Sequence, residues 1–450
     1  MRNRCVAMAA LWGAAAALSP ACLAAAPAAG CTASAQASLA ALASGHFTTA
    51  AADFSRATAA ALPPAKLTQT WSIIEAQAGR YMGHAAARLQ AFEGRRVTVV
   101  PVTFARLPLD FVVSCDAAGR IVTFYFLKPG VLSKPQPVQP HVSADDVRVE
   151  PLAVPSKFGS LRGALTLPRG KGPFPAVVLV GGSGPSDLNE TVDGSKPFRD
   201  IADGLARLGV ASLRYDKRQV DYPLQMAANR HLTVDEEATD DALSAARVLA
   251  EQPTVDPQRV FVLGHSEGGM LAPRIGKRDR SLAGIILLAA PARPTLTVMA
   301  EQVREQGSRQ GWPKAKIAAS EQALAQEQAL LAKASPARPP TGSFDGVPQT
   351  WWLSLHDYHS VAVARTLRLP MLVLQGGSDF QVSPTRDFDA WKKALAGKPN
   401  VTFHLFPGLS HLFTPAGKTL TPADYAKAEH VDPAVINFIA TWVKAQPAAK

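Results

Sequence analysis

From residue 141 onward, short apolar runs alternate with segments of helical periodicity. Continuous apolar runs are typical of strands covered on both faces, whereas apolar residues three or four apart are typical of amphipathic helices. The predicted strands are 175–180, 210–215, 260–263, 284–290, 371–375 and 401–406, after a hairpin of 147–149 with 161–167. Helices are predicted at 201–208, 235–251 and 431–443. The alternation predicts an α/β domain over residues 141–450, with a mostly parallel sheet and helices on both faces.

Residues 32–127 have a different pattern. Helical spacing of large apolar residues connects Leu39, Leu42, Phe47 and Phe54, and then Trp71, Ile74 and Tyr81. Strand patterns follow at 97–104, 109–113 and 121–126. Helices followed by an antiparallel meander predict a small α+β domain. The proline-rich stretch 128–140 is predicted to be a semi-rigid linker to the second domain.

The strand 260–263 leads directly into Gly264–Gly268, whose sequence is Gly-His-Ser-Glu-Gly, and a helical pattern follows. A strand, a sharp turn and a helix around Gly-x-Ser-x-Gly are the features of a nucleophile elbow. Ser266 would then lie at a strand end in a strained conformation, and a Cβ at Gly264 or Gly268 would collide with a neighbouring strand or helix. The alternative is an ordinary glycine-rich loop.

A serine hydroxyl attacks at neutral pH only with a neighbouring base, and the base needs a carboxylate that fixes its tautomer. Asp379 and His411 each follow a predicted strand by one short turn, as Ser266 does. Side chains that follow parallel strands meet at the carboxyl edge of a sheet. We therefore predict a catalytic triad of Ser266, Asp379 and His411, in the chain order of α/β-hydrolases. His265 points away in such a turn and is predicted to be structural.

Backbone N–H groups near the serine would stabilise the oxyanion formed during acyl transfer. One predicted donor is Glu267, which follows the nucleophile. The second is Ser183, because the strand 175–180 ends in Gly181–Pro185, with the sequence Gly-Gly-Ser-Gly-Pro, where Gly182 allows a close approach. The alternative, a phosphate-binding loop, lacks the Gly-Lys-Ser/Thr that should follow.

The strand–helix alternation stops at about residues 294–360. Residues 301–334 have a helical pattern rich in alanine and glutamine, and Trp351, Trp352 and Tyr358 follow. An insert between consecutive strands of such a sheet is expected to lie over the strand ends as a cap. Its aromatic side chains either line an acyl pocket or anchor the cap to the body.

The first 24 residues have the plan of a secretory signal peptide, with Arg2 and Arg4 before a short apolar run. An exported, periplasmic protein is therefore expected, and Cys31 and Cys115 are candidates for a disulfide. The alternatives are an N-terminal membrane anchor, unpaired thiols and a lipoprotein anchored through Cys31. No later segment is long enough for a stable membrane span. The net charge of +11 is scattered, and no nucleic-acid motif accompanies it.

These motifs resemble those of the α/β-hydrolase superfamily, as do Arg-Tyr-Asp-Lys-Arg at 214–218 and Leu-Gln-Gly-Gly-Ser-Asp at 374–379. Within it they resemble bacterial carboxylesterases related to dienelactone hydrolases and the prolyl oligopeptidase group. Some of those esterases also carry a small N-terminal domain of unknown function. The resemblance implies an α/β-hydrolase fold that cleaves short-chain acyl esters of small molecules through an acyl-enzyme on Ser266, without a metal or cofactor. The family usually has glycine where this chain has Gln219. This departure weakens the resemblance for the loop that follows, and it does not affect the triad.

Other functions share part of this evidence. A prolyl oligopeptidase-like serine peptidase or a thioesterase would have the same triad order. A non-catalytic envelope-binding protein would use the N-terminal domain instead, but all three triad positions are filled. The charged segment 214–218 follows a strand and is predicted to fix its loop by ion pairs.

Overall fold

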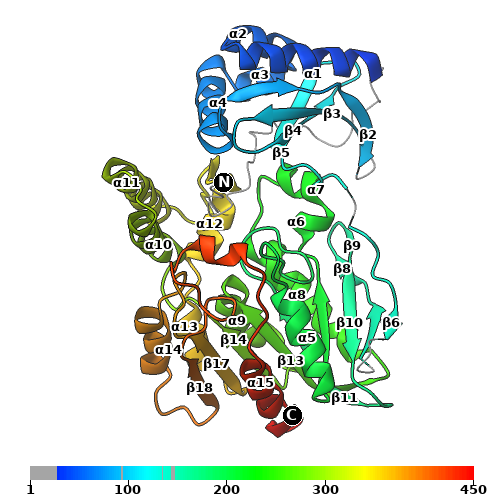
Figure 1. Cartoon of the computed structure of the whole chain (residues 1–450), viewed down its shortest axis with the longest axis vertical. Coiled ribbons are helices and arrows are strands. Elements are labelled where there is room, and N and C mark those ends of the chain that lie inside the picture. The colour runs from blue at the N-terminus through cyan, green and yellow to red at the C-terminus, as the bar shows by residue number, and fades with distance from the viewer. Residues whose placement is uncertain (1–27, 93–94, 134, 143–146, 450) are drawn as a thin grey trace.

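The computed structural model describes residues 28–92, 95–133, 135–142 and 147–449, which form a small unit stacked on a larger one (Figure 1). The predicted signal peptide, residues 1–24, lies outside these residues. Within the described residues, no helix combines the length and the apolar character that a bilayer crossing requires.

The small unit places helices on one face of an antiparallel sheet. Its helices are α1 (Ala28–Ala43), α2 (Phe47–Ala50), α3 (Arg56–Ala61) and α4 (Pro64–Ala78), with the short 3-10 turn η1 (Ala51–Asp53). Its strands are β1 (Tyr81–His84), β2 (Arg88–Phe92), β3 (Arg95–Phe104), β4 (Leu109–Cys115) and β5 (Ile121–Leu127). The expected helix through Tyr81 is wrong: α4 ends because Gly79 adopts φ 89°, and Tyr81 begins β1. Tyr81 still packs against Trp71, with the ring centroids 6.2 Å apart.

Both faces of this sheet are apolar. Alternate residues of β3, including Val100 and Val102, pack under α1 and α4. The intervening residues Val97 and Val99, together with Tyr125 of β5, form a second cluster. Leu224 of α7 (Pro223–Ala228), in the larger unit, belongs to that cluster, so the larger unit packs against part of this second face.

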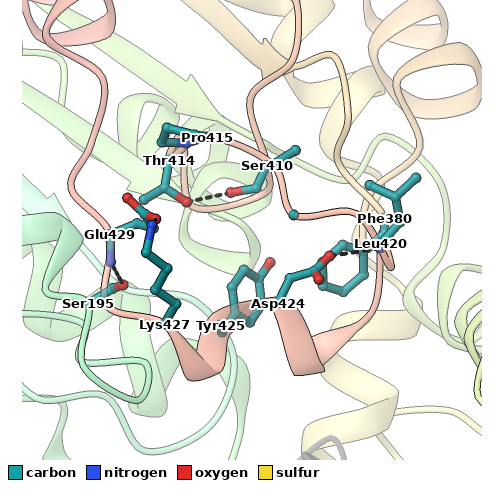
Figure 2. Close-up of a pocket in the computed structure, with 12 residues that line it drawn as sticks. Ser195, Phe380, Ser410, Thr414, Pro415, Leu420, Asp424, Tyr425, Lys427 and Glu429 are labelled. Atoms are coloured by element: carbon teal, nitrogen blue, oxygen red, sulfur yellow. Dashed lines mark hydrogen bonds and ion pairs between the residues drawn. The ribbon is translucent and has the colours of Figure 1, made fainter.

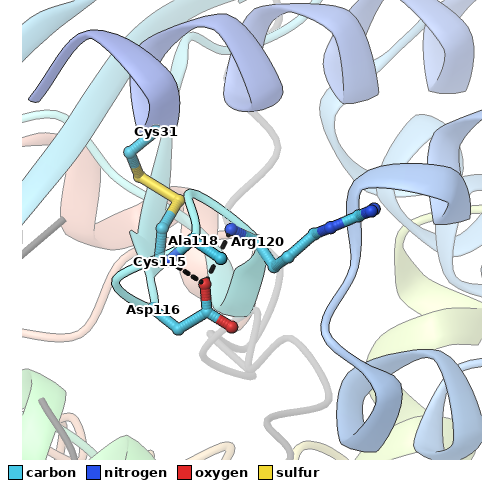
Figure 3. The surroundings of a disulfide bond; sticks show 5 residues. All are labelled: Cys31, Cys115, Asp116, Ala118 and Arg120. Atoms are coloured by element: carbon cyan, nitrogen blue, oxygen red, sulfur yellow. Dashed lines mark hydrogen bonds between the residues drawn. A yellow bond between two sulfur atoms is a disulfide. The ribbon is translucent and has the colours of Figure 1, made fainter. Parts of the chain in front are cut away.

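Cys31 and Cys115, the candidate pair, are joined by a disulfide that ties α1 to β4 (Figure 3). Their Cα atoms are 5.7 Å apart and are separated by 84 positions in the sequence. The turn after β4 is held by Asp116, whose Oδ1 accepts the N–H groups of Ala118 and Arg120.

The larger unit contains, within the described residues, a nine-stranded sheet in the order β18-β17-β14-β13-β11-β12-β10-β7-β6. The strands from β18 to β12 are parallel, and β10, β7 and β6 continue the sheet with antiparallel pairing. Their bounds are β6 His141–Val142, β7 Arg148–Pro151, β10 Gly163–Leu167, β11 Phe174–Val180, β12 Ala211–Tyr215, β13 Val255–His265, β14 Gly284–Leu288, β17 Met371–Gly376 and β18 Val401–Phe406. A separate hairpin joins β8 (Val154–Ser156) to β9 (Gly159–Leu161). The predicted mostly parallel α/β sheet is confirmed.

Helices cover both faces of this sheet. On one face, α5 (Pro197–Arg207) and α15 (Pro433–Ala445) pack with Phe261 and Leu263 of β13. On the other, α8 (Asp240–Ala250), α9 (Glu267–Arg278) and α14 (Asp389–Ala394) pack with Val260 and Val262. The remaining short elements are α6 (Arg218–Asp221), η2 (Asp235–Thr239), η3 (Pro384–Phe388) and η4 (Pro422–Ala426). The central strand is therefore buried on both sides, as its unbroken apolar run predicts.

The insert between β14 and β17 is largely helical. It comprises α10 (Thr295–Arg309), α11 (Lys314–Leu331), a hairpin of β15 (Ser343–Phe344) with β16 (Val347–Pro348), α12 (Gln349–His356) and α13 (Ser360–Thr366). The single helix expected at 301–334 is wrong, because Gly311 with φ 68° ends the first helix and Pro313 caps the second. The two helices then fold back on each other as a hairpin (Figure 1).

We expect the double variant Cys31→Ser/Cys115→Ser to destabilise the small unit. Because the disulfide closes a loop with a sequence separation of 84, its removal should cost about 2–4 kcal/mol in the free energy of unfolding. Differential scanning calorimetry should show the transition of this unit at a lower temperature. An unchanged thermogram would contradict a stabilising role for the bond.

Candidate active site

The turn between β13 and α9 has the geometry of a nucleophile elbow. Ser266 adopts φ 52° and ψ −116°, a conformation that non-glycine residues rarely occupy. A Cβ on Gly264 would lie 2.0 Å from the carbonyl oxygen of Gly268, and one on Gly268 would lie 2.3 Å from that of Val180. The strand, the helix and the neighbouring strand β11 therefore meet at distances that only glycine permits. Ser266 is half-buried, and its N–H donates to Leu288 of β14 at 2.9 Å.

Asp379 and His411 lie in the loops after β17 and β18 and form a buried pair. His411 Nδ1 lies 2.7 Å from Asp379 Oδ2, and their side chains are 5 % and 0 % exposed. Asp379 also accepts the amide Nε2 of Gln375 and the N–H groups of Gln381 and Val382, at 2.7–2.9 Å. The carboxylate is thus fixed in place, and it holds the proton of His411 on Nδ1, which leaves Nε2 as the basic nitrogen.

His265, which precedes the nucleophile, connects the elbow to the loop of His411. The two imidazole rings are 4.6 Å apart between centroids, and His265 Nε2 donates to the carbonyl oxygen of His411 at 3.0 Å. His265 Nδ1 donates to Glu190 Oε1 at 2.9 Å. Since both ring nitrogens face acceptors, the imidazolium is the form that satisfies both. Burial opposes this charge, but Glu190 and the His411 carbonyl outweigh it and raise the pKa of His265 above its ordinary value.

The glycine-rich loop after β11 lies against the nucleophile. A Cβ on Gly182 would be 3.3 Å from the Cβ of Ser266. The N–H of Gly182 donates to Glu190 Oε1 at 2.7 Å, so within the predicted oxyanion hole Gly182 provides space and not a donor. Ser183 follows at an exposed position, and Glu267 begins α9, where the first N–H groups have no partner within the helix.

Glu190 is a site residue that the sequence pattern does not reveal. It lies in the loop between β11 and α5, has φ 51°, and is buried to 6 % exposure. It contacts both the glycine-rich loop and His265. Since loop glutamates are usually solvated, no spacing or periodicity sets this one apart, and only the tertiary contacts do.

The segment after His411 lines a small pocket with residues that include Thr414, Leu420 and Tyr425 (Figure 2). This pocket has a volume of only about 10 Å³ and is also lined by Ser195, Phe380 and Ser410. Ser410 and Thr414 share a hydrogen bond of 2.9 Å, and Gln381 Nε2 donates to the Tyr425 hydroxyl at 2.8 Å. The pocket has room for about one water molecule, and its walls connect this segment to Phe380 and Ser410, which adjoin Asp379 and His411.

The three aromatic candidates of the cap differ in their surroundings. Trp351 donates its indole N–H to Glu237 Oε2, and Trp352 donates to the carbonyl oxygen of Phe344 at 2.9 Å. Both indoles are buried in the main core, so their contacts are those of anchors. Tyr358 instead lines a cavity of about 270 Å³, and its hydroxyl donates to Met270 of α9 at 2.8 Å.

Ion pairs hold the charged segment after β12. Arg162 binds Asp216 at 2.6 Å, Arg218 binds Asp241 at 2.6 Å, and Lys217 contacts Glu237 and Glu267. Gln219 donates to Glu237. In the part of the chain that the structure describes, no group of three or more His, Cys, Asp or Glu side chains could hold a metal ion.

The chain is similar to a protein family, to a characterised relative and to several solved structures. The family described as serine aminopeptidase, S33, matches residues 191–414. Esterase EstD of Thermotoga maritima is 33 % identical over 403 residues, which cover 89 % of this chain and 92 % of EstD. Among solved structures, a putative dienelactone hydrolase from Klebsiella pneumoniae aligns at 14 % identity and a TM-score of 0.40, over 66 % of this chain and 99 % of its own. An esterase from Pyrobaculum calidifontis aligns at 19 % identity and a TM-score of 0.41, over 66 % and 85 %.

The similarity to EstD extends over nearly the whole of both chains. The larger unit also contains the nucleophile elbow on which serine hydrolases of this fold depend. The chain therefore belongs to the α/β-hydrolase esterases that include EstD, and it is a serine esterase.

Proposed function

We propose that this esterase hydrolyses short-chain acyl esters through an acyl-enzyme on Ser266. The observation that carries the proposal is the buried His411–Asp379 pair, whose imidazole packs against the ring of His265, the residue before the strained Ser266. A structural serine has no need of such a conformation, which costs about 1–3 kcal/mol.

In the proposed mechanism, His411 Nε2 takes the proton of Ser266 as its Oγ attacks the acyl carbonyl. The N–H groups of Glu267 and Ser183 donate to the oxyanion. The carbon–oxygen bond to the alcohol then breaks, and the alcohol leaves with the proton from His411. Water, activated by His411, attacks the acyl-enzyme and releases the acid and Ser266.

A preference for short acyl groups is what the resemblance to bacterial carboxylesterases implies. Beside α9, Met270, Leu355, Tyr358 and Val361 line a cavity of about 270 Å³, together with the charged side chains of Arg293 and Arg365. Tyr358 is the predicted pocket residue in this lining, and the triad residues are not part of it.

A peptidase is the second candidate, because the matched family is described as serine aminopeptidase. An amide is harder to cleave than an ester because its leaving group is poorer, and the same triad serves both reactions. Parallel assays of p-nitrophenyl esters and aminoacyl or prolyl anilides separate the two activities.

Export to the periplasm is also part of the proposal. The disulfide between Cys31 and Cys115 fits an oxidising compartment. The same bond occupies the thiol that a lipid anchor at Cys31 would require.

Replacement of the triad residues should remove esterase activity. We expect Ser266→Ala to lower kcat roughly 10⁴-fold or more, and Asp379→Asn to lower it by roughly 10³–10⁴-fold through the wrong tautomer of His411. Hydrolysis of p-nitrophenyl butyrate measures both effects, and Asp389→Asn, at an exposed carboxylate of α14, is the matched control. Near-native activity of Ser266→Ala, or no labelling of the native serine by a fluorophosphonate, would overturn the mechanism.

The acyl preference should be visible in a chain-length series. We expect kcat/KM on p-nitrophenyl esters to peak at acetate to hexanoate and to fall at least tenfold by laurate, as the resemblance to short-chain carboxylesterases implies. Tyr358→Ala, which enlarges the cavity of about 270 Å³, tests whether this cavity receives the acyl group, because the range should then extend toward longer chains. Equal rates on acetate and laurate esters would contradict the short-chain preference.

The charge on His265 should make its contribution to stability depend on pH. A raised pKa means that the stabilisation is complete below the ordinary value of about 6.5 and is lost as pH rises through the folded-state value. His265→Gln should therefore lower the apparent Tm more at pH 6 than at pH 9. Glu190→Gln should show the same dependence, because it removes the charge that retains the proton. Equal losses at both pH values would indicate a neutral His265.

A further inference from the structure

Lys217 is a buried cation beside the nucleophile elbow that the proposed mechanism does not use. It follows β12, and its side chain is 5 % exposed. Its Nζ donates to the carbonyl oxygen of Gly182 at 2.9 Å and to Glu237 Oε1 at 2.7 Å, and it contacts Glu267 Oε1 at 3.4 Å. Burial disfavours the ammonium, but the two carboxylates outweigh it and raise the pKa of Lys217 above its ordinary value.

The contact with Gly182 fixes the direction of the neighbouring N–H. The carbonyl of Gly182 and the N–H of Ser183 belong to one trans peptide unit and point in opposite directions. An ammonium that holds the carbonyl therefore prevents rotation of this unit and sets where the Ser183 N–H points. It also polarises the peptide, which makes that N–H a stronger donor. The preceding peptide is held separately, because the N–H of Gly182 donates to Glu190.

The contact with Glu267 links the same ammonium to the other proposed oxyanion donor. The carboxylate of Glu267 faces Lys217, while its backbone N–H lies at the start of α9, next to Ser266. Burial and the charge of Glu237 raise the pKa of Glu267 to about 7, against the effect of Lys217. One side chain thus spans the two segments that supply the N–H groups.

Fold stability alone does not account for a cation in this position. Buried ion pairs contribute little net stability, because the cost of desolvation offsets their attraction. The neighbouring pair of Arg218 with Asp241 is equally buried but contacts neither Gly182 nor Glu267, and it serves to hold α6 against α8. Lys217 and Arg218 therefore contact different parts of the structure, and substitution of each one tests a different role.

We propose that Lys217 is the positioning residue of the oxyanion hole. It orients the Gly182–Ser183 peptide and Glu267 so that their N–H groups converge on the oxyanion formed at Ser266. This inference rests on the proposed function, because the two N–H groups have this task only if Ser266 attacks an acyl carbonyl.

The test compares Lys217→Met with Arg218→Met, a matched loss of a buried cation next to it. Each variant is titrated to completion with a fluorophosphonate, so that kcat refers to labelled active sites. Steady-state kinetics on p-nitrophenyl butyrate give kcat and KM, and an alkyl trifluoromethyl ketone, which forms a tetrahedral adduct with an oxyanion on serine, gives an inhibition constant. The corresponding methyl ketone reports binding of the unreacted carbonyl.

We expect Lys217→Met to lower kcat roughly 10- to 100-fold, somewhat less than the loss of an oxyanion donor itself. KM and the methyl ketone constant should stay within threefold of native, while the trifluoromethyl ketone constant rises in parallel with the fall in kcat. Arg218→Met should lower the apparent Tm with kcat per labelled site within twofold of native. If Lys217→Met does not fold, Glu267→Gln takes its place, because it weakens the contact between Lys217 and Glu267. It should lower kcat and raise the trifluoromethyl ketone constant roughly three- to tenfold, while KM stays within threefold of native.

An unchanged kcat and trifluoromethyl ketone constant in Lys217→Met, or in Glu267→Gln where that variant stands in for it, would overturn the role of Lys217. So would a loss of activity that matches that of Arg218→Met. Failure of the proposed function is a different result, namely a native enzyme that the fluorophosphonate does not label at Ser266.

Discussion

The strained backbone of Ser266 is the constraint around which the larger unit is built. A non-glycine residue at φ 52° and ψ −116° is held there only if its surroundings allow no alternative. Here β13, α9 and β11 approach so closely that Gly264 and Gly268 have no room for a Cβ. The elbow therefore depends on the register of the parallel strands, and that register depends on the apolar layers on both faces of the sheet.

Buried charges then fix the loops that surround the elbow. On one side, Glu190 and His265 connect the glycine-rich loop to the backbone of His411. On the other, Lys217 connects the same loop to Glu267. Each charge is costly to bury, and each has a partner on a different segment of the chain. The result is a site whose loops come from separate parts of the chain and are nevertheless held by short, direct contacts.

The small unit reaches the site region through a continuous series of contacts. Part of the second face of its sheet packs on Leu224 of α7. The loop after α7 contacts the cap, because Thr350 donates to the carbonyl of Leu232 at 2.7 Å and Ser354 accepts the N–H of Val234 at 2.9 Å. Trp351, on the same helix, binds Glu237, which pairs with Lys217. A series of contacts thus runs from the small unit through α7 and the loop after it to the cap.

The sequence by itself determined the parallel sheet, the elbow and the positions of Asp379 and His411, because these follow from apolar runs and from residues placed directly after them. It misplaced a helix boundary at Gly79 and missed the break at Gly311, where a positive φ ends each helix. Only the tertiary structure decided which charges meet: Glu190 has no pattern around it, and Lys217 contacts Gly182, Glu237 and Glu267 across separations of 35, 20 and 50 positions. Periodicity reports the face of one element, whereas a buried ion pair depends on how several elements pack, and that information is absent from any single segment.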